Sequence, residues 1–232
     1  MMLRGSVALV TGASQGIGLA IRSELERRGV LLECSSLRES PGCAAVDVRD
    51  AKAVRQWVDA VVKRHGHIDL LVHSAGRAES VGPFLSVPST EFQDVIDTNL
   101  TGTFHVLQSA LPSMLSRGRG QIIVIGSRAG HRAHPLLAAY SASKFGVRGL
   151  CQAVAKELAE TSSGVSCITI APAGVKTPMR EKLFGKENSD RQQSPESVAN
   201  IVADIAEGAI EVANGSDVLI TNGQVTEISP AS

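Results

Sequence analysis

The sequence predicts an α/β domain in which a doubly wound, seven-stranded parallel sheet is flanked by helices. Three observations support this fold class. Short apolar runs alternate along the chain with longer segments of helical period. The apolar runs are continuous rather than alternating, which is typical of parallel strands buried on both faces. No repeat, low-complexity tract or linker interrupts the 232 residues, so 1–232 is predicted to be one domain.

Seven short runs rich in Val, Ile, Leu and Ala predict the strands. They lie at 7–10, 30–32, 44–46, 70–72, 122–125, 165–171 and 218–220. A parallel pair normally needs a crossover of about a dozen residues or more. Residues 36–43, between the second and third runs, are too few and too rich in turn formers for a helix. We therefore expect a loop or a single turn there.

Segments of helical period predict the helices between these strands. One follows the first strand, and the others span 51–65, 89–116, 138–161 and 195–208. In 51–65, valines and Trp57 form one apolar stripe, with Asp50 placed as the N-cap and Gly66 just past the end.

Composition excludes several classes of function. The chain has 23 Lys+Arg and 23 Asp+Glu, so no overall charge attracts nucleic acid or an anionic membrane. No apolar run approaches the length of a membrane span, and the start lacks the apolar core of a signal peptide. The four cysteines have no CxxC spacing, and no metal site is predicted; Cys34, Cys151 and Cys167 lie in apolar runs as reduced core residues. We expect a soluble, cytoplasmic protein.

The turn after the first strand carries a nucleotide-binding pattern. Glycines at 12, 16 and 18 come directly after that strand and open a helix. They allow a tight turn and let backbone N–H groups approach a pyrophosphate at the positive end of the helix. This context predicts a dinucleotide cofactor.

The residues at the end of the second strand indicate which dinucleotide is preferred. An NAD site usually has an acidic residue there to bind the ribose 2′-hydroxyl. Here Ser36 holds that position, with Arg38 close by to hold a 2′-phosphate, so NADP is favoured and NAD is the alternative. A shift in strand register would bring Glu33 forward and reverse the preference.

Tyr140, the only tyrosine, is followed four residues later by Lys144, and Ser127 precedes it by thirteen. On a helix, a four-residue step places Tyr140 and Lys144 on one face. Free tyrosine has a pKa of about 10, roughly 3 units above the ideal for proton transfer at neutral pH. A unit charge at ~4 Å supplies about the 4 kcal/mol needed at an effective dielectric of ~20. The pair predicts acid–base chemistry.

Taken together, these motifs resemble the short-chain dehydrogenase/reductase family, in its short, non-extended branch, and within it the 3-oxoacyl-ACP reductase-like carbonyl reductases. The resemblance covers nearly the whole chain and implies a Rossmann-type domain. Its motifs follow in order: the glycine turn 11–18, Asp47-Val48, His73 to Gly76, Asn99 to Gly102, Ile125 to Ser127, Tyr140 to Lys144, and Pro172 to Thr177.

The resemblance implies a catalytic role for four residues. Tyr140 would be the general acid in reduction and the base in oxidation, and Lys144 would lower its pKa and hold the nicotinamide ribose. Ser127 would donate to the substrate oxygen, and Asn99 would anchor a water that passes protons to Lys144. The cofactor would lie along Gly12, Ser14, Gln15, Gly16, Ile17, Gly18, Ser36, Arg38, Asp47, Val48, Ala75, Gly76, Tyr140, Lys144, Pro172, Val175 and Thr177.

The chain departs from the family pattern at three places. His73-Ser74 replaces Asn-Asn, Pro172-Ala173-Gly174 replaces Pro-Gly, and Asn222-Gly223 replaces a longer Asp-Gly-Gly ending. Since that ending commonly helps to build tetramers, the resemblance implies a homodimer through the 89–116 and 138–161 helices, with a homotetramer as the alternative.

The substrate is expected to be a small-molecule carbonyl compound or alcohol. Its pocket would be lined by 128–137, by 178–193, and by Arg77, Ala78 and Glu79. The segment 128–137 is basic, which suits an anionic substrate such as an acyl-carrier-protein thioester but equally a solvated loop. The predicted function is that of an NADP(H)-dependent oxidoreductase. The alternative is a non-catalytic dinucleotide-binding sensor or scaffold subunit.

Overall fold

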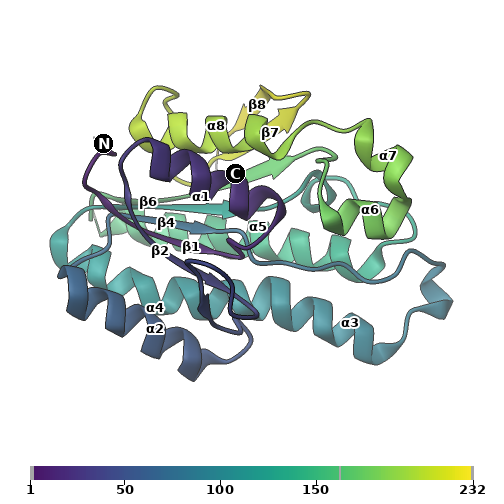
Figure 1. Cartoon of the computed structure of the whole chain (residues 1–232), viewed down its shortest axis with the longest axis horizontal. Coiled ribbons are helices and arrows are strands. Elements are labelled where there is room, and N and C mark those ends of the chain that lie inside the picture. The colour runs from purple at the N-terminus through teal and green to yellow at the C-terminus, as the bar shows by residue number, and fades with distance from the viewer. Residues whose placement is uncertain (1–2, 162, 231–232) are drawn as a thin grey trace.

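The computed structural model describes residues 3–161 and 163–230, and within them the strands form one eight-stranded sheet. The strand order is β3-β2-β1-β4-β5-β6-β7-β8, as Figure 1 shows in part. The strands are β1 Val7–Thr11, β2 Leu31–Ser36, β3 Ala44–Ala45, β4 Leu70–His73, β5 Gly120–Ile125, β6 Val165–Pro172, β7 Asp217–Thr221 and β8 Gln224–Ser229. All seven predicted strands are found, and they are mutually parallel.

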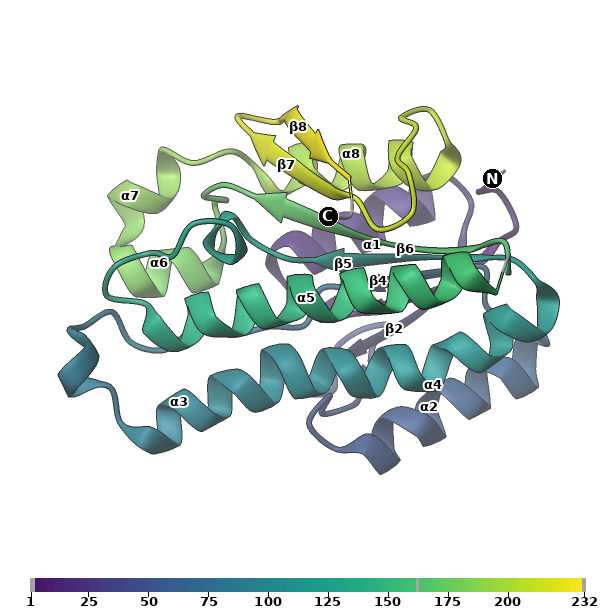
Figure 2. The same cartoon turned by 180° about the vertical axis from the view of Figure 1, so that it is seen from behind.

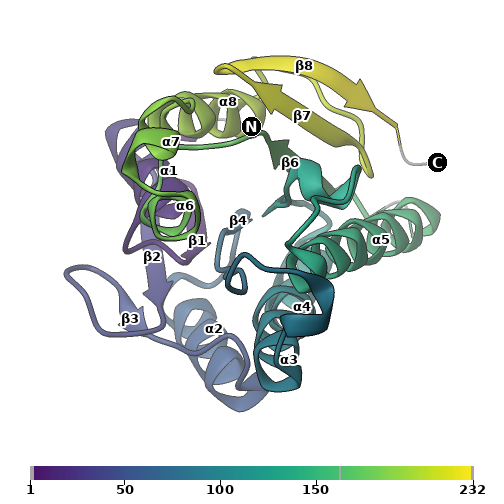
Figure 3. The same cartoon turned by 90° about the vertical axis from the view of Figure 1, so that its right-hand side faces the viewer.

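Helices cover both faces of the sheet, so the doubly wound architecture is confirmed. On one face, α1 (Gly16–Arg27) and α8 (Pro195–Glu207) pack on each other and on the sheet. On the other face lie α2 (Ala51–His65), α4 (Gly102–Arg117) and α5 (Ala138–Glu160), as Figure 2 shows. The end-on view of Figure 3 separates these layers. Each face has its own core, because the buried strands present apolar side chains in both directions.

The eighth strand, β8, was not predicted from the sequence. β8 runs antiparallel to β7, and the two are joined through Asn222 and Gly223, both with positive φ. Such a pair is typical of a two-residue hairpin turn. β8 lies at the edge of the sheet and is largely exposed, with only Val225 and Ile228 apolar. It therefore lacks the continuous apolar run that reveals the buried strands.

The connection from β2 to β3 is a loop, as predicted. A turn at Ser40–Cys43, with Gly42 in the left-handed region, replaces a crossover helix. β3 itself is only two residues long. The short connection leaves β3 as a small edge strand beside the end of β2.

The predicted 89–116 helix is continuous in space but changes its winding. It comprises α3 (Ser89–Ile96), a π-helical turn (Asp97–Thr101) and α4. Asn99 lies in the π turn and is buried. A π turn adds one residue to the helix and often marks a functional site. After β6, two short helices, α6 (Pro178–Phe184) and α7 (Lys186–Asp190), stand beside the carboxyl ends of the strands.

Candidate active site

A cavity of about 580 Å³ lies at the carboxyl ends of β1, β2, β4 and β5. Fourteen of the seventeen residues predicted for the cofactor line it: Gly12, Ser14, Gln15, Gly16, Ile17, Gly18, Ser36, Asp47, Val48, Ala75, Gly76, Tyr140, Lys144 and Thr177. Arg38, Pro172 and Val175 do not line it, and the cavity also takes in residues that the sequence analysis did not single out, among them Leu37, Arg49, Thr98 and Ile125.

The glycine turn leaves no room for side chains. Gly12 has φ +66°, and a Cβ there would lie 2.7 Å from the Ala75 backbone nitrogen. A Cβ on Gly18 would lie 2.2 Å from the Gly12 carbonyl oxygen. β1, the turn and α1 are thus packed backbone to backbone. No side chain caps the first turn of α1, so its N–H groups face the cavity edge at Gln15 to Gly18.

The end of β2 has the predicted register. Thr11 pairs with Ser35, so Ser36 lies at the strand end and lines the cavity. Glu33 lies further back, where it accepts from His65 Nε2 (2.8 Å) and forms an ion pair with Arg64. The register shift that would bring Glu33 to the cofactor does not occur. The Ser36 hydroxyl donates to the Arg38 carbonyl oxygen (2.5 Å) and so holds the turn that carries the exposed Arg38 side chain.

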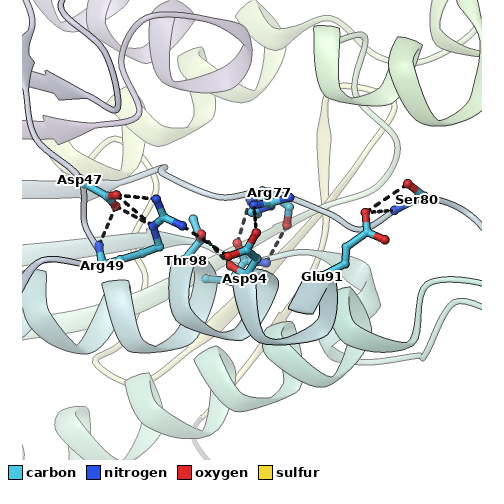
Figure 4. Close-up of polar contacts among 8 residues, drawn as sticks. Asp47, Arg49, Arg77, Ser80, Glu91, Asp94 and Thr98 are labelled. Atoms are coloured by element: carbon cyan, nitrogen blue, oxygen red, sulfur yellow. Dashed lines mark hydrogen bonds and ion pairs between the residues drawn. The ribbon is translucent and has the colours of Figure 1, made fainter. Parts of the chain in front are cut away.

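Asp47, Arg49 and Arg77 line the cavity and belong to a chain of charged groups that is joined through Asp94 (Figure 4). Arg49 pairs with Asp47 (2.6 Å) and approaches Asp94 (3.5 Å), which also pairs with Arg77 (2.9 Å). The bond from Arg49 is the main cause of a lowered pKa at Asp47. Asp47 is therefore an ionised carboxylate, paired with Arg49, among the residues predicted to line the cofactor site.

Tyr140 and Lys144 line the cavity, and Ser127, which is not part of that lining, is bonded to Tyr140. Tyr140 and Lys144 lie in the first two turns of α5, and Ser127 lies two residues after the end of β5. Lys144 is buried, and its Nζ donates to the Ile125 carbonyl oxygen (2.9 Å). The Ser127 hydroxyl accepts from the Ala129 backbone N–H (3.1 Å) and is also hydrogen-bonded with Tyr140.

The titration behaviour of this group differs from the expectation. Burial raises the pKa of Tyr140, and the hydrogen bond with Ser127 opposes this only in part. Burial lowers the pKa of Lys144 to about 8. Lys144 was expected to lower the pKa of Tyr140, but its Nζ lies beneath the ring, 5.7 Å from the centroid. In this arrangement, desolvation outweighs the ammonium.

The Asn99 side chain braces the backbone that passes through the site. Its Oδ1 accepts from the Arg77 N–H (2.8 Å), and its Nδ2 donates to the Arg77 carbonyl oxygen (2.8 Å) and to Ser143 Oγ (2.9 Å). A Cβ built on Gly76 would lie 3.3 Å from Asn99 Oδ1 and 3.8 Å from Lys144 Nζ. Gly76 therefore fills the space between them. A water held by Asn99 remains a prediction.

His73 occupies a buried position beside Thr11. Its Nδ1 lies 2.8 Å from Thr11 Oγ1, which accepts from the N–H groups of Ser74 (3.2 Å) and Ala75 (3.3 Å). Thr11 thus bonds the backbone at the place where His73-Ser74 departs from the family's Asn-Asn. In the described part of the chain, His73 Nε2 has no partner, and burial lowers the pKa of the ring to about 3.

The segment after β6 is arranged around Gly174 and Thr177. A Cβ on Gly174 would lie 2.1 Å from Gln192 Oε1, which is the end of a flexible side chain. Thr177 accepts from the Arg180 N–H (3.2 Å) as the N-cap of α6 and also touches the glycine turn. Pro172 ends β6, and Val175 is buried beside Gln193 rather than in the cavity.

This geometry agrees with comparisons to known proteins. The family model described as "short chain dehydrogenase" matches residues 6–188. The chain belongs to the short-chain dehydrogenase family. It is 33% identical over 245 residues to the D-threitol dehydrogenase of Mycolicibacterium smegmatis, covering 95% of this chain and 93% of that one.

Two further similarities agree with this family. The chain is 30% identical over 243 residues to the 3-oxoacyl-[acyl-carrier-protein] reductase FabG of Vibrio cholerae, covering 96% and 98%. It superposes on the crystal structure of levodione reductase with a TM-score of 0.87, 26% identity, and 95% and 97% coverage. The protein is a short-chain NAD(P)-dependent oxidoreductase that acts on CH–OH and C=O groups.

The cavity of this dehydrogenase fits a dinucleotide. The fit rests on three features: a glycine turn packed on Ala75, the uncapped first turn of α1, and an elongated lining that runs from Ser36 to Lys144. No helix in the described residues is long and apolar enough to cross a membrane. Those residues also contain no cluster of side chains that would hold a metal ion.

The substrate side of the dehydrogenase contains part of what was expected. Met179 and Lys182 of α6, together with Arg77 and Ala78, line the cavity. Glu79, which was expected there, is fully buried and bonded to the N-terminus of α5 instead. In the segment 128–137, the basic side chains of Arg128, Arg132 and His134 are exposed, and the ring of His134 contacts that of Phe184 (5.8 Å).

Proposed function

We propose that this dehydrogenase transfers a hydride between NADP(H) and a carbonyl compound or secondary alcohol, with Tyr140 as the general acid and base. The observation that carries the proposal is that Tyr140 and Lys144 line the dinucleotide cavity and that Tyr140 is hydrogen-bonded with Ser127. A non-catalytic sensor or scaffold would have no need of this arrangement.

The residues divide the work as follows. The bound nicotinamide supplies or accepts the hydride. Ser127 donates a hydrogen bond to the substrate oxygen, where negative charge develops during reduction. Tyr140 gives its phenolic proton to that oxygen in reduction and takes it back in oxidation. The raised pKa of Tyr140 keeps the phenol protonated at neutral pH, which favours the donor role.

Lys144 lies beside Tyr140 at the proposed catalytic centre. Its Nζ is anchored by the Ile125 carbonyl oxygen and lies between the Tyr140 ring and Gly76. From there it would bind the nicotinamide ribose. With a pKa of about 8, it can exchange a proton near neutral pH and so restore the proton of Tyr140.

The test is Tyr140→Phe with Ser127→Ala beside it. Removing the phenolic proton should lower kcat by about 10²-fold or more, while the Kd for NADPH stays within about threefold because the phenol contributes little to dinucleotide binding. Turnover is measured with a panel of ketones, quinones and acyl thioesters by loss of cofactor absorbance. Residual turnover of Tyr140→Phe comparable to wild type would refute the acid–base assignment and favour the binding-only alternative.

The preference for NADP over NAD rests on Ser36 and Arg38. Ser36 leaves the end of β2 without a carboxylate, and Glu33 is held away by Arg64 and His65. We expect Arg38→Ala to weaken NADPH binding far more than NADH binding. Ser36→Asp should lower NADPH affinity and raise NADH affinity, because its carboxylate repels a 2′-phosphate. Equal effects of Arg38→Ala on the binding of both cofactors would contradict the proposed preference for NADP.

The substrate class is proposed more broadly. The relatives are named for a polyol, an acyl-carrier-protein thioester and, in the solved structure, a diketone. Lys182 lines the cavity, and Arg128 and Arg132 are exposed on the segment 128–137; this positive charge supports an anionic or acyl-thioester substrate. A kcat/KM for acyl thioesters no better than for neutral ketones would argue against it.

The assembly is proposed to be a homodimer through the helix that spans α3 to α4 and through α5, with a tetramer as the alternative. Large apolar side chains on these helices are exposed, including Phe104 and Phe145. Exposed apolar surface of this kind is typical of an interface. Light scattering on the purified protein distinguishes monomer, dimer and tetramer.

A further inference from the structure

Glu79 is a fully buried carboxylate that the proposed mechanism does not use. Its exposed fraction is 0%. It belongs to residues 74–82, which we name the strap. This segment leads from β4 towards α3, and its first residues, 74–78, line the cavity. A buried carboxylate is costly unless its charge is compensated by hydrogen bonds or a partner. What compensates Glu79 therefore indicates its role.

The compensation comes from the helix that carries Tyr140. Glu79 Oε1 accepts from the Ala139 N–H (2.7 Å), and Oε2 accepts from the Tyr140 N–H (2.9 Å). The N-cap position of α5, Leu137, offers no side-chain hydrogen bond. Glu79 supplies the missing cap from a distant part of the chain, and the positive end of the helix favours its charge.

The strap is held firmly at several other points. Thr11 accepts from the N–H groups of Ser74 and Ala75, and Asn99 binds both backbone groups of Arg77. The Ser80 N–H donates to Glu91 (2.9 Å). Because Ala75 and Gly76 line the cofactor cavity, Glu79 connects the wall of that cavity to the backbone of Tyr140.

We propose that Glu79 is a positioning residue for the reaction: through its bonds to the Ala139 and Tyr140 backbone, it fixes the first turn of α5 and with it the distance between the Tyr140 hydroxyl and the substrate oxygen. This inference rests on the proposed acid–base role of Tyr140. It assigns Glu79 no contact with substrate or cofactor.

The charge of Glu79 has a second effect at the same hydroxyl. Burial raises the pKa of Tyr140, Ser127 opposes this, and the nearby Glu79 carboxylate raises it further. The other charged group facing the phenol is Lys144, beneath the ring. Glu79 thus stabilises the protonated form of Tyr140, and removing its charge should ease deprotonation.

This effect can be measured without any substrate. Tyr140 is the only tyrosine in the chain, so the near-ultraviolet absorbance of tyrosinate titrates this one residue. In Glu79→Gln, which keeps an acceptor oxygen but not the charge, we expect the midpoint to fall below that of wild type. The matched control is Glu91→Gln, which loosens the strap at Ser80 but leaves α5 alone, and its midpoint should equal that of wild type. An unchanged midpoint in Glu79→Gln would overturn the proposed effect of the Glu79 charge on the pKa of Tyr140.

Kinetics test the positioning part. A small displacement of a catalytic group costs up to about 10²-fold, so Glu79→Gln should lower kcat by about tenfold or more with little change in cofactor Kd. Glu79→Asp keeps the charge but is one methylene shorter, so kcat should fall while the tyrosinate midpoint stays close to that of wild type. If Glu79→Gln retained wild-type kcat, or lost activity only in proportion to the unfolded fraction, the proposal would fail.

The two proposals fail in different ways. If Tyr140→Phe remains active, the acid–base role is wrong whatever Glu79 does. If Tyr140→Phe is inactive and the Glu79 variants keep both midpoint and kcat, only the inference about Glu79 is lost. Should Glu79→Gln not fold, Glu79→Asp carries the kinetic test alone.

Discussion

Lys144 Nζ lies beneath the Tyr140 ring, 5.7 Å from its centroid, and donates to the Ile125 carbonyl oxygen rather than to the phenol. The ammonium is therefore anchored by the end of β5 at a buried site. This position accounts for two properties: the pKa of Lys144 is lowered to about 8 by burial, and that of Tyr140 is raised. The pair is arranged to hold a proton on the tyrosine and to exchange one at the lysine.

Lys144→Met should stabilise the cofactor-free protein at neutral pH while abolishing turnover. The lysine pKa is about 8 in the folded protein, against an ordinary value of 10.5. Between these values the unfolded chain binds a proton that the folded chain does not, so wild-type stability rises with pH across this window. Below it, wild type bears the full cost of a buried ammonium.

The measurement is urea unfolding at several pH values. The stability advantage of Lys144→Met should be largest at neutral pH and should shrink by up to about 1.4 kcal/mol per pH unit above pH 8. Lys52→Met, at an exposed position of α2, is the control and should show no such trend. A pH-independent difference between Lys144→Met and wild type would contradict the buried-ammonium interpretation.

His73→Asn should make the protein more tolerant of acid. The pKa of His73 is about 3 in the folded state, against an ordinary value of 6.5. As pH falls below 6.5, the unfolded chain binds a proton that the folded chain rejects, so wild-type stability is progressively lost. At about pH 5 this amounts to roughly 2 kcal/mol relative to neutral pH.

The comparison is the change in unfolding free energy between neutral pH and about pH 5. It should be smaller in His73→Asn than in wild type, and unaffected by His134→Asn at an exposed position. Identical acid sensitivity of all three proteins would show that His73 does not titrate in this way.

Gly12→Ala should destabilise the fold and abolish cofactor binding. Its Cβ would meet the backbone of Ala75 at 2.7–2.8 Å, and backbone atoms in the strap cannot move cheaply. Gly66→Ala is the matched control, since Gly66 has φ +79° but nothing within 4 Å of a Cβ.

We expect a loss of about 1 kcal/mol for Gly66→Ala, from backbone strain alone, and about 3 kcal/mol or more for Gly12→Ala. Thermal unfolding and NADPH titration measure both effects. Equal losses for the two variants would mean that the close approach to Ala75 has no energetic weight.

Most of the fold follows from local patterns. Val7–Val10 and Ile122–Ile125 are continuous apolar runs, and such runs reveal strands buried on both faces. β8 was not predicted because it is a half-exposed edge strand that pairs only with β7. Its hairpin depends on Asn222 and Gly223, which the sequence analysis interpreted only as a shortened family motif.

In the site, too, local patterns predicted some features and contacts between distant segments decided the others. Spacing alone brings Tyr140 and Lys144 onto one helix face, and the glycine pattern at Gly12 to Gly18 predicts the cavity that they share. The partners of the lysine were not predictable, because the Ile125 carbonyl is reached across 19 residues of sequence. Glu79, 60 residues before Ala139, could be interpreted only as a lining residue.

By itself, the sequence determined the strand and helix periods, the glycine turn and the Tyr140–Lys144 pair that we propose to react, because these depend on spacings of a few residues within single elements. Only the tertiary structure decided that Lys144 lies beneath the Tyr140 ring, that Glu33 is held away from the cofactor cavity, and that Glu79 caps α5. These relationships depend on burial and on contacts between distant segments, which set pKa values and no local pattern encodes.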